Sequence, residues 1–262
     1  MKLLVGGILA LDDLKTPHTS GKAIVGGAGI YSSVAASFFT QPGLVGPAGS
    51  DFPEAALAAL RERGVALDGV PRLREPSFHW SGEYRDDMAQ AITHQTRVEI
   101  LEAFNWGVPA EWRQPTGLLL CNNDPSIQLR LLEQVQAGWV AADSMNLWIE
   151  IQRAALEQVV AQTDLLFLND AEALAFTDAA SLDAAGAAPF PVGARVVLIK
   201  RCAKGATPFH AHGDARRPAP PARQFIYPTG AGDTLAGAAC GRLARVSLTH
   251  LSPPTHTVFF SL

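Results

Sequence analysis

The sequence contains few cysteines, and these are not arranged as a disulfide framework. Among its 262 residues there are only three, with no Cys-x-x-Cys spacing: Cys121, Cys202 and Cys240. An odd, widely spaced set predicts free thiols in a reducing compartment. We therefore expect a cytoplasmic protein.

Long hydrophobic runs and a surplus of basic residues are also lacking. The apolar stretch at residues 1–11 meets two aspartates too early to span a bilayer, so it predicts a buried first strand. The formal net charge is −4, which argues against nucleic acid or an anionic membrane as the main partner. Hydrophobic residues make up 48% of the chain, enough for the core of one large α/β domain.

Short apolar runs alternate with longer helical patterns, which is typical of parallel βαβ units. The expected strands are Leu3–Val5, Leu118–Cys121, Trp139–Ala142, Leu165–Leu168 and Val196–Lys200. The expected helices are Ile30–Phe39, Phe52–Arg63, Ile127–Gln136, Ile149–Gln162 and Ala171–Phe176. Polar residues follow several of these strands, namely Asn122, Asn123, Asp143, Asn169 and Asp170. Because ligands bind beyond the carboxyl ends of such strands, these residues predict a binding rim.

One segment departs from this alternation. Residues 78–85 and 92–100 each alternate apolar and polar side chains around a polar turn, which predicts an antiparallel hairpin with one apolar face. That face needs a cover, so we expect a lid over a substrate that can also pair two subunits as a homodimer. A plain edge hairpin is the alternative.

The strongest local signal is Pro228-Thr-Gly-Ala-Gly-Asp233, followed by an Ala- and Leu-rich stretch up to Arg245. A glycine turn before a helix is a site for anions, because free N–H groups and the helix dipole both favour negative charge. Asp233 is either the N-cap of this helix or a base that takes the proton of an attacking hydroxyl. The anion site and the carboxylate together favour phosphoryl transfer.

This run resembles the C-terminal signature of the ribokinase-like (PfkB) carbohydrate kinases. Five further segments are similar to motifs of that family, in the same order along most of the chain: Gly7–Asp12, Val25–Ala35, Gly46–Asp51 with Gly64-Val65, Leu168–Glu172 and Ile199–Ala206. Several spaced motifs in order are more specific than any one of them.

The resemblance implies a single ribokinase-like α/β domain over residues 1–262. Its fold is a three-layer α/β/α sandwich with a mostly parallel central sheet and a small β-hairpin lid, built from about residues 12–24 and 76–100. The implied function is an ATP-dependent carbohydrate kinase that moves the γ-phosphoryl group of ATP to a hydroxyl of a sugar or sugar-like substrate. ATP and Mg²⁺ are the implied cofactors.

The resemblance also assigns roles to residues. In catalysis, Asp233 is the base and the anion hole consists of Gly230, Ala231 and Gly232. The implied substrate-binding residues are Asp12, Gly26, Gly27 and Asn123. The implied nucleotide-binding residues are Asn169, Glu172, Lys200, Lys204, Gly205 and Thr229, and Glu172 is also an indirect ligand of the metal.

The sequence departs from the family at four places, one of which is Tyr31, where a sugar-binding asparagine is frequent. Tyr227 replaces an aspartate, so the resemblance does not extend to a monovalent-cation site. Lys200-Arg201-Cys202 replaces the commoner Thr-x-Gly of the nucleotide loop. The region after residue 246 shows no helical period and has the pattern of a truncated terminus, which leaves an impaired family member that binds without turnover as the alternative.

A dinucleotide-binding oxidoreductase is a further alternative. Residues 27–32 come close to the pattern G-x-G-x-x-G, and Asp51 follows about twenty residues on, as that fingerprint requires. However, Ser32 occupies the place of the third glycine. Asp51 precedes Phe52-Pro53, and we expect it to cap the helix that follows.

Overall fold

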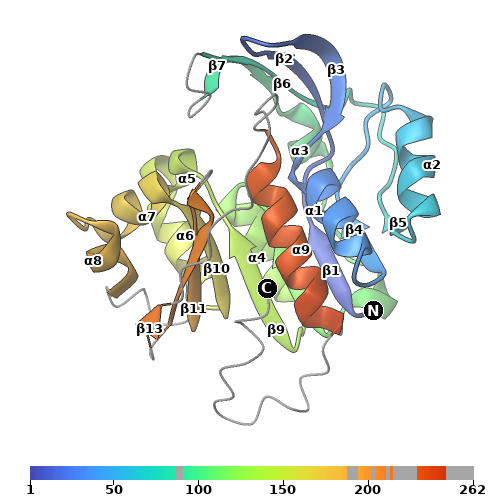
Figure 1. The fold of residues 1–262 in the computed structure, drawn as a ribbon. Helices are drawn as coiled ribbons and strands as arrows, with labels where there is room; N and C mark the ends of the chain where they lie inside the picture. Colours follow the sequence, from blue (N-terminus) through green and yellow to red (C-terminus); the bar gives the residue numbers. More distant parts are fainter. Residues whose placement is uncertain (86–90, 188–193, 202–203, 211–212, 215–228, 246–262) are drawn as a thin grey trace.

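A nine-stranded sheet forms the centre of the molecule (Figure 1). The computed structural model describes residues 1–85, 91–187, 194–201, 204–210, 213–214 and 229–245. Tyr227 and the terminus predicted to be truncated after residue 246 lie outside these ranges. The strand order is β13-β12-β11-β10-β9-β8-β1-β4-β5, and the strands from β11 to β5 run parallel whereas β12 and β13 are antiparallel. Their bounds are Leu3–Gly6 (β1), Pro42–Val45 (β4), Ala66–Gly69 (β5), Gly117–Leu120 (β8), Trp139–Asp143 (β9), Leu165–Asn169 (β10), Val196–Lys200 (β11), Ala206–His210 (β12) and Gly213–Asp214 (β13).

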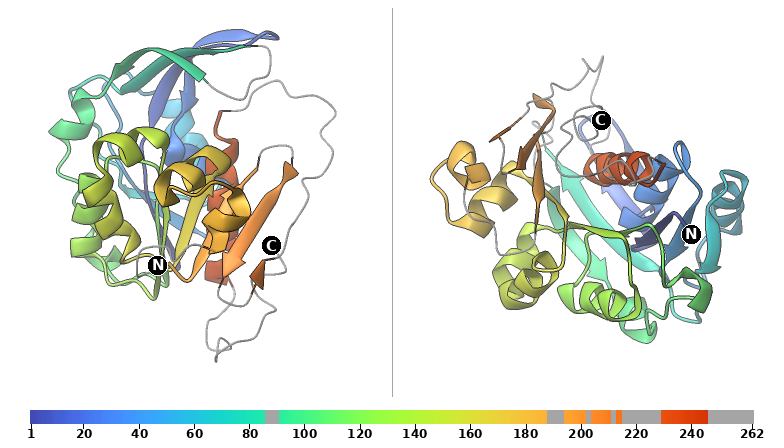
Figure 2. Two further views of the ribbon diagram at one scale, coloured as in Figure 1. Left: turned by 90° about the vertical axis from the view of Figure 1, so that its left-hand side faces the viewer. Right: turned by 90° about the horizontal axis from the view of Figure 1, so that it is seen from below.

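Helices cover both faces of this sheet, as the two views of Figure 2 show. One face carries α1 (Ala28–Ser37), α2 (Glu54–Glu62) and α9 (Ala231–Arg245). The other carries α4 (Pro125–Gln134), α5 (Asn146–Ile151), α6 (Arg153–Val160), α7 (Asp170–Thr177) and α8 (Leu182–Ala187). The short α3 (Glu99–Ala103) and a 3₁₀ turn at Ala110–Trp112 lead into β8. The α/β fold with a mostly parallel sheet, predicted from the alternation, is confirmed.

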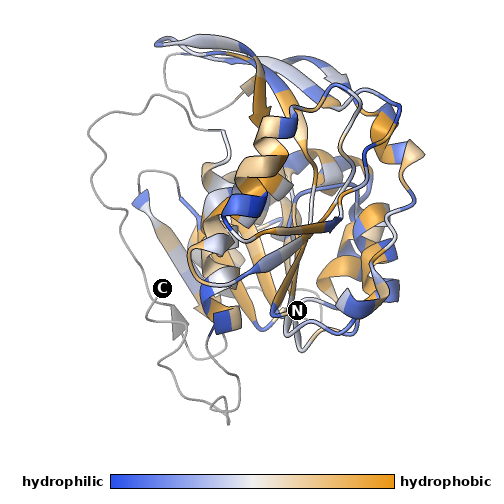
Figure 3. Cartoon of the chain, turned by 90° about the vertical axis from the view of Figure 1, so that its right-hand side faces the viewer, coloured by the Kyte–Doolittle hydropathy of each residue, from blue (hydrophilic) through white to orange (hydrophobic). Residues whose placement is uncertain are grey.

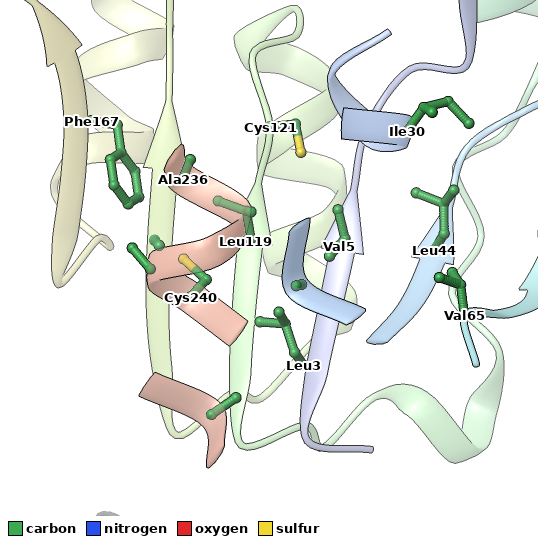
Figure 4. Close-up of a cluster of buried hydrophobic side chains, with 14 of the residues drawn as sticks. Leu3, Val5, Ile30, Leu44, Val65, Leu119, Cys121, Phe167, Ala236 and Cys240 are labelled. Carbon is green, nitrogen blue, oxygen red and sulfur yellow. The ribbon is translucent and has the colours of Figure 1, made fainter. Parts of the chain in front are cut away.

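The central strands are buried because successive side chains enter the cores on opposite faces. Leu3, Val5, Leu119 and Phe167 pack with α9, near Ala236 and Cys240 (Figure 4). The residues between them pack against α4, α6 and α7. Figure 3 shows the hydrophobic residues that run along these strands. Burial on both faces explains why the strands are continuous apolar runs.

Helices α1 and α9 lie side by side with their backbones in close approach. A Cβ atom at Gly237 would overlap the backbone of Ser32, and one at Gly241 would lie 2.8 Å from the Cα of Ala36. At the beginning of α9, Ser32 Oγ donates a hydrogen bond to the carbonyl oxygen of Asp233 at 3.0 Å. Small residues therefore set the position of α9 and of Asp233 in its first turn.

A second sheet of four strands, ordered β3-β2-β6-β7, stands over the carboxyl ends of the central strands. It comprises β2 (Ala10–Lys15), β3 (Ser20–Gly26), β6 (Phe78–Tyr84) and β7 (Ala91–Arg97). The hairpin expected over residues 78–100 forms as antiparallel β6 and β7, and β6 pairs in parallel with β2 of a second hairpin.

Three local expectations were wrong. Pro53, not Asp51, is the N-cap of α2; Asp51 instead accepts hydrogen bonds from the backbone N of Ser77 at 2.7 Å and from Arg97 at 3.3 Å. Asp51 therefore fastens the base of the second sheet. The helix expected over residues 149–162 is broken at Gln152 into α5 and α6. Asp233 is not an N-cap, since α9 begins at Ala231.

Among the described helices, none is long and apolar enough to cross a membrane.

Because α1 and α9 approach closely, we expect Gly237→Ala to destabilise the protein, although replacing glycine with alanine usually stabilises a helix. Alanine raises helix propensity by up to about 1 kcal/mol, but overpacking of a tight contact costs about 1–3 kcal/mol. We expect a net loss of about 1–2 kcal/mol in the free energy of unfolding, measured by urea denaturation. Ala238→Gly, at a half-buried neighbouring position, is the control and should lose about 1 kcal/mol from propensity alone. A stabilised Gly237→Ala variant would contradict the close packing.

Candidate active site

The first turn of α9 is built as an anion site. Gly230 has φ 79°, a left-handed conformation that favours glycine, and a Cβ atom there would overlap the ring of Tyr31. The N–H of Thr234 donates to the carbonyl oxygen of Gly230 at 2.8 Å and so closes the first helical turn. The N–H groups ahead of it have no helical acceptor and, with the helix dipole, favour negative charge.

Asp233 lies in this turn, in a crowded electrostatic setting. Burial and, to a lesser degree, the nearby carboxylate of Asp143 raise the pKa of Asp233 to about 6, while Lys200 opposes both. A carboxyl group with a pKa near 6 is ionised at neutral pH yet accepts a proton readily. That is the behaviour required of a general base.

Lys200 and Asp143 form a buried ion pair next to this turn. Lys200 Nζ lies 2.7 Å from Asp143 Oδ1 and 2.8 Å from Oδ2, and the side chains are 15% and 3% exposed. The strands that carry them, β11 and β9, are separated by β10, so the lysine crosses the end of β10. A Cβ atom at Gly232 would lie 3.2 Å from Lys200 Nζ. The ammonium group is therefore directly behind the anion site.

The ion pair keeps Lys200 charged. Burial alone would lower the pKa of Lys200, but the carboxylates of Asp143 and Glu172 outweigh burial and raise the pKa above its ordinary value. Lys200 is therefore a cation at neutral pH.

Asn169 and Glu172 form a capping box at the beginning of α7. Glu172 Oε2 accepts from the backbone N of Asn169 at 2.7 Å, Oε1 accepts from Asn169 Nδ2, and Asn169 Oδ1 accepts from the backbone N of Glu172. Burial raises the pKa of Glu172 to about 7, with Lys200 opposing. The Asn-x-x-Glu spacing thus fixes the carboxylate rigidly at the rim.

A cavity of about 560 Å³ lies between the two sheets. It is lined by Ile8, Ala10, Asp12, Gly27, Ala28, Tyr31, Phe78, Trp80, Tyr84, Ala91, Thr93, Asn122, Met145, Asn146, Asn169, Glu172, Thr229 and Asp233. Burial raises the pKa of Asp12 to about 6, while His79 lowers it. The second sheet contacts the turn that precedes α9 directly, because Thr229 Oγ1 donates a hydrogen bond to the hydroxyl of Tyr84 at 3.1 Å.

The cavity brings together only part of the set predicted from sequence. It contains Asp12, Gly27, Asn169, Glu172, Thr229 and Asp233. The cavity lining does not include Gly26, Gly230, Ala231, Gly232 or Lys200, although a Cβ atom at Gly26 would overlap Oδ2 of Asp12, which does line it. Asn123 does not line it either: the side chain is 3% exposed and Oδ1 accepts from the backbone N of Asp124 at 2.8 Å. Lys204 and Gly205 lie beyond the end of β11, where Gly205 has φ 89°.

Other cavity residues were missed by the sequence analysis. Asn122, rather than its neighbour Asn123, faces the cavity, and the aromatic residues of β6 form one wall. Asp143 was recognised as a polar strand end but was not assigned to the site. Its position at the carboxyl end of β9, next to the strand that carries Asn169, was the available signal.

A helix N-terminus with free N–H groups, beside a partly buried carboxylate and a lysine, is an arrangement that suits phosphoryl transfer. Comparisons with known proteins agree. The model of the pfkB family carbohydrate kinases matches residues 112–251, more than half of the chain. The chain belongs to the pfkB family of carbohydrate kinases. It is accordingly an ATP-dependent kinase that transfers a phosphoryl group to a hydroxyl of a sugar or sugar-like substrate. The oxidoreductase alternative is wrong.

Individual relatives are consistent with this family. A cytidine kinase of Thermococcus kodakarensis is 29% identical over 248 residues, covering 90% of this chain and 86% of the relative. A putative ribokinase II of E. coli has the same fold, with a TM-score of 0.77 at 18% identity over 91% of this chain and 85% of that one. A nucleoside kinase of Burkholderia thailandensis, solved with inosine, has a TM-score of 0.72 at 19% identity over 93% and 88%.

The buried ion pair generates a prediction about stability. Lys200→Met leaves Asp143 buried without its cation, and breaking a buried pair costs about 3–5 kcal/mol. The control is Arg195→Met, which removes the exposed partner of Asp164 just before β11 (82% and 35% exposed, 3.3 Å) and should cost at most about 1 kcal/mol. The free energy of unfolding is measured by urea denaturation of both variants and of the double variant Lys200→Met/Asp143→Asn. Equal losses of free energy in the two single variants, or no recovery of stability in the double variant, would contradict the stabilising role of the buried ion pair.

Proposed function

We propose that this kinase phosphorylates a nucleoside. Its sugar would lie beside Asp12 and Asp233, and its nucleobase would lie against the aromatic wall that Phe78, Trp80 and Tyr84 of β6 form. The observation that carries this is the composition of one cavity, which is lined both by the carboxylates of Asp12 and Asp233 and by the rings of Trp80 and Tyr84. A sugar offers hydroxyl groups to carboxylates, and a planar base offers a face on which aromatic rings stack.

The aromatic wall is flat for a local reason. A Cβ atom at Gly82 would overlap the ring of Trp80, so the indole lies along β6 over the glycine. Its Nε1 donates to Thr93 Oγ1 at 3.0 Å on the paired strand β7. The ring is thus fixed as a platform before any ligand binds. The similarity to a cytidine kinase and the fold shared with a nucleoside kinase that was solved with inosine support a nucleoside substrate.

The proposed chemistry follows from the geometry. The ionised carboxylate of Asp233 takes the proton of the attacking hydroxyl, and the amides of Gly230, Ala231 and Gly232 stabilise charge on the transferred phosphoryl group. Asp12 holds sugar hydroxyls. The bare backbone of Gly26 and Gly27 lets the sugar approach closely, and Asn123 stays a predicted donor to it.

On the nucleotide side, we propose that Lys200 and Thr229 act at the phosphates, and that Lys204 and Gly205 belong to the loop that follows the nucleotide. Carboxylates around the cavity suit Mg²⁺, which prefers oxygen ligands and keeps several waters. Glu172 would hold the ion through water, since both of its oxygens accept hydrogen bonds from Asn169. When bound, the ion neutralises phosphate charge.

We further propose that residues 12–24 and 76–100 act as the lid of a single domain. Support comes from the cavity, since β2, β6 and β7 supply one of its walls. Pairing of two chains through the lid and a cytoplasmic location stay predictions.

Asp233→Asn should abolish the base while it preserves shape. General-base catalysis contributes about 10²–10⁴-fold, so kcat should fall by that factor with substrate affinity retained. Because the pKa of Asp233 is about 6, the wild-type rate should fall as the pH drops through about 6, where the carboxyl group becomes protonated. Asp12→Asn is the control: it should raise KM and keep the acid limb of kcat. A variant Asp233→Asn with more than about a tenth of wild-type turnover would refute the assignment.

The substrate class is tested by ADP release with cytidine, uridine, inosine, adenosine and ribose. We expect kcat/KM for at least one nucleoside to exceed that for ribose by about 10-fold or more, the effect of one stacked base at about 1–3 kcal/mol. Trp80→Leu should remove most of this preference and leave ribose unaffected. A preference for free sugars would overturn the nucleoside assignment, and nucleotide binding without turnover of any acceptor would favour the impaired alternative.

A further inference from the structure

Asn122 lies two residues beyond the end of β8 and lines the cavity. Its Oδ1 accepts a hydrogen bond from the indole Nε1 of Trp148 at 3.0 Å. An indole N–H can only donate, so the amide oxygen must face Trp148. The planar amide then directs its Nδ2 away from Trp148, and Nδ2 has no protein partner among the described residues.

The segment that carries this amide is held on two sides. Trp148 lies in α5, whose first residue, Asn146, lines the same cavity. At the end of α5, Gln152 Nε2 donates to Asp124 Oδ2 at 2.7 Å. The loop after β8 and helix α5 are thus joined by two side-chain hydrogen bonds. Such supporting contacts hold a polar group in one orientation before the ligand arrives.

We propose that Asn122 is a specificity residue that recognises the nucleobase. Its N–H groups would donate hydrogen bonds to a carbonyl oxygen or an unprotonated ring nitrogen on the edge of the nucleobase. This inference rests on the proposed nucleoside substrate. Trp148 is a positioning residue in this arrangement, because it fixes which end of the amide meets the base. An acceptor edge is favoured, and an edge that offers only donors is rejected because it would leave Asn122 unpaired.

Asn122→Asp separates this role from a structural one. The carboxylate still accepts from Trp148 and keeps the shape, but it presents an acceptor to the cavity in place of donors. KM for cytidine and inosine should rise by about 10–100-fold, the effect of leaving a buried hydrogen-bonding group unpaired. The KM for ATP and the KM for ribose should change much less than the KM for the two nucleosides, because the lost N–H donors face the nucleobase.

Trp148→Phe provides the second variant. It leaves Asn122 in place but frees the amide to rotate, so KM for the nucleosides should rise less than in Asn122→Asp. In this background the further effect of Asn122→Asp should shrink, which double-variant kinetics measures. Melting temperatures and the KM for ATP report on folding, and Asn122→Ala replaces Asn122→Asp if that variant unfolds.

The possible failures are distinguishable. A wild-type enzyme that prefers ribose to every nucleoside removes the proposed function and this inference with it. A wild-type enzyme that prefers nucleosides, with Asn122→Asp and Asn122→Ala leaving the nucleoside KM unchanged or raising it equally for ribose, overturns the role of Asn122 alone. Additive effects of Asn122→Asp and Trp148→Phe overturn the role of Trp148.

Discussion

The close approach of α1 and α9 is the constraint on which the site depends. Two glycines of α9 allow its backbone to contact that of α1, and Ser32 bonds the carbonyl of Asp233. The position of the proposed base is thereby fixed relative to α1, whose first turn borders the substrate side of the cavity. Close packing of this kind transmits small displacements, so a shift of either helix would move the base relative to the hydroxyl.

Much of the fold could be predicted from the sequence because its elements carry local signals. Buried parallel strands such as Leu165–Asn169 are continuous apolar runs. The glycine-rich segment at residues 228–233 predicts both the turn and the helix that follows it. The strands β4 and β5 were missed since β4 begins with Pro-Gly and β5 ends with Asp-Gly, pairs that are typical of turns. The break at Gln152 was missed because the apolar period continues across it.

The site was less predictable, because it depends on which residues meet across the sheet. Lys200 and Asp143 are 57 residues apart, on strands separated by β10, so no local pattern announces their pairing. At the end of β8, Asn122 and Asn123 are chemically identical, and only the backbone decides which one faces the cavity. The N-cap reading of Asp233 failed because Gly230 takes the left-handed position and lets the helix begin two residues earlier, at Ala231.

The hydrogen bond between Thr229 and Tyr84 joins the lid sheet to the turn that precedes α9. A movement of the lid that displaces Tyr84 breaks this bond, so the two segments cannot separate without a free-energy cost. By thermodynamic linkage the effect would be mutual in the proposed lid: a ligand that stabilises the turn would also stabilise the second sheet over the cavity, and a ligand bound beneath that sheet would also stabilise the turn. This hydroxyl pair is therefore the contact through which the proposed lid would couple binding of the acceptor to binding of the nucleotide.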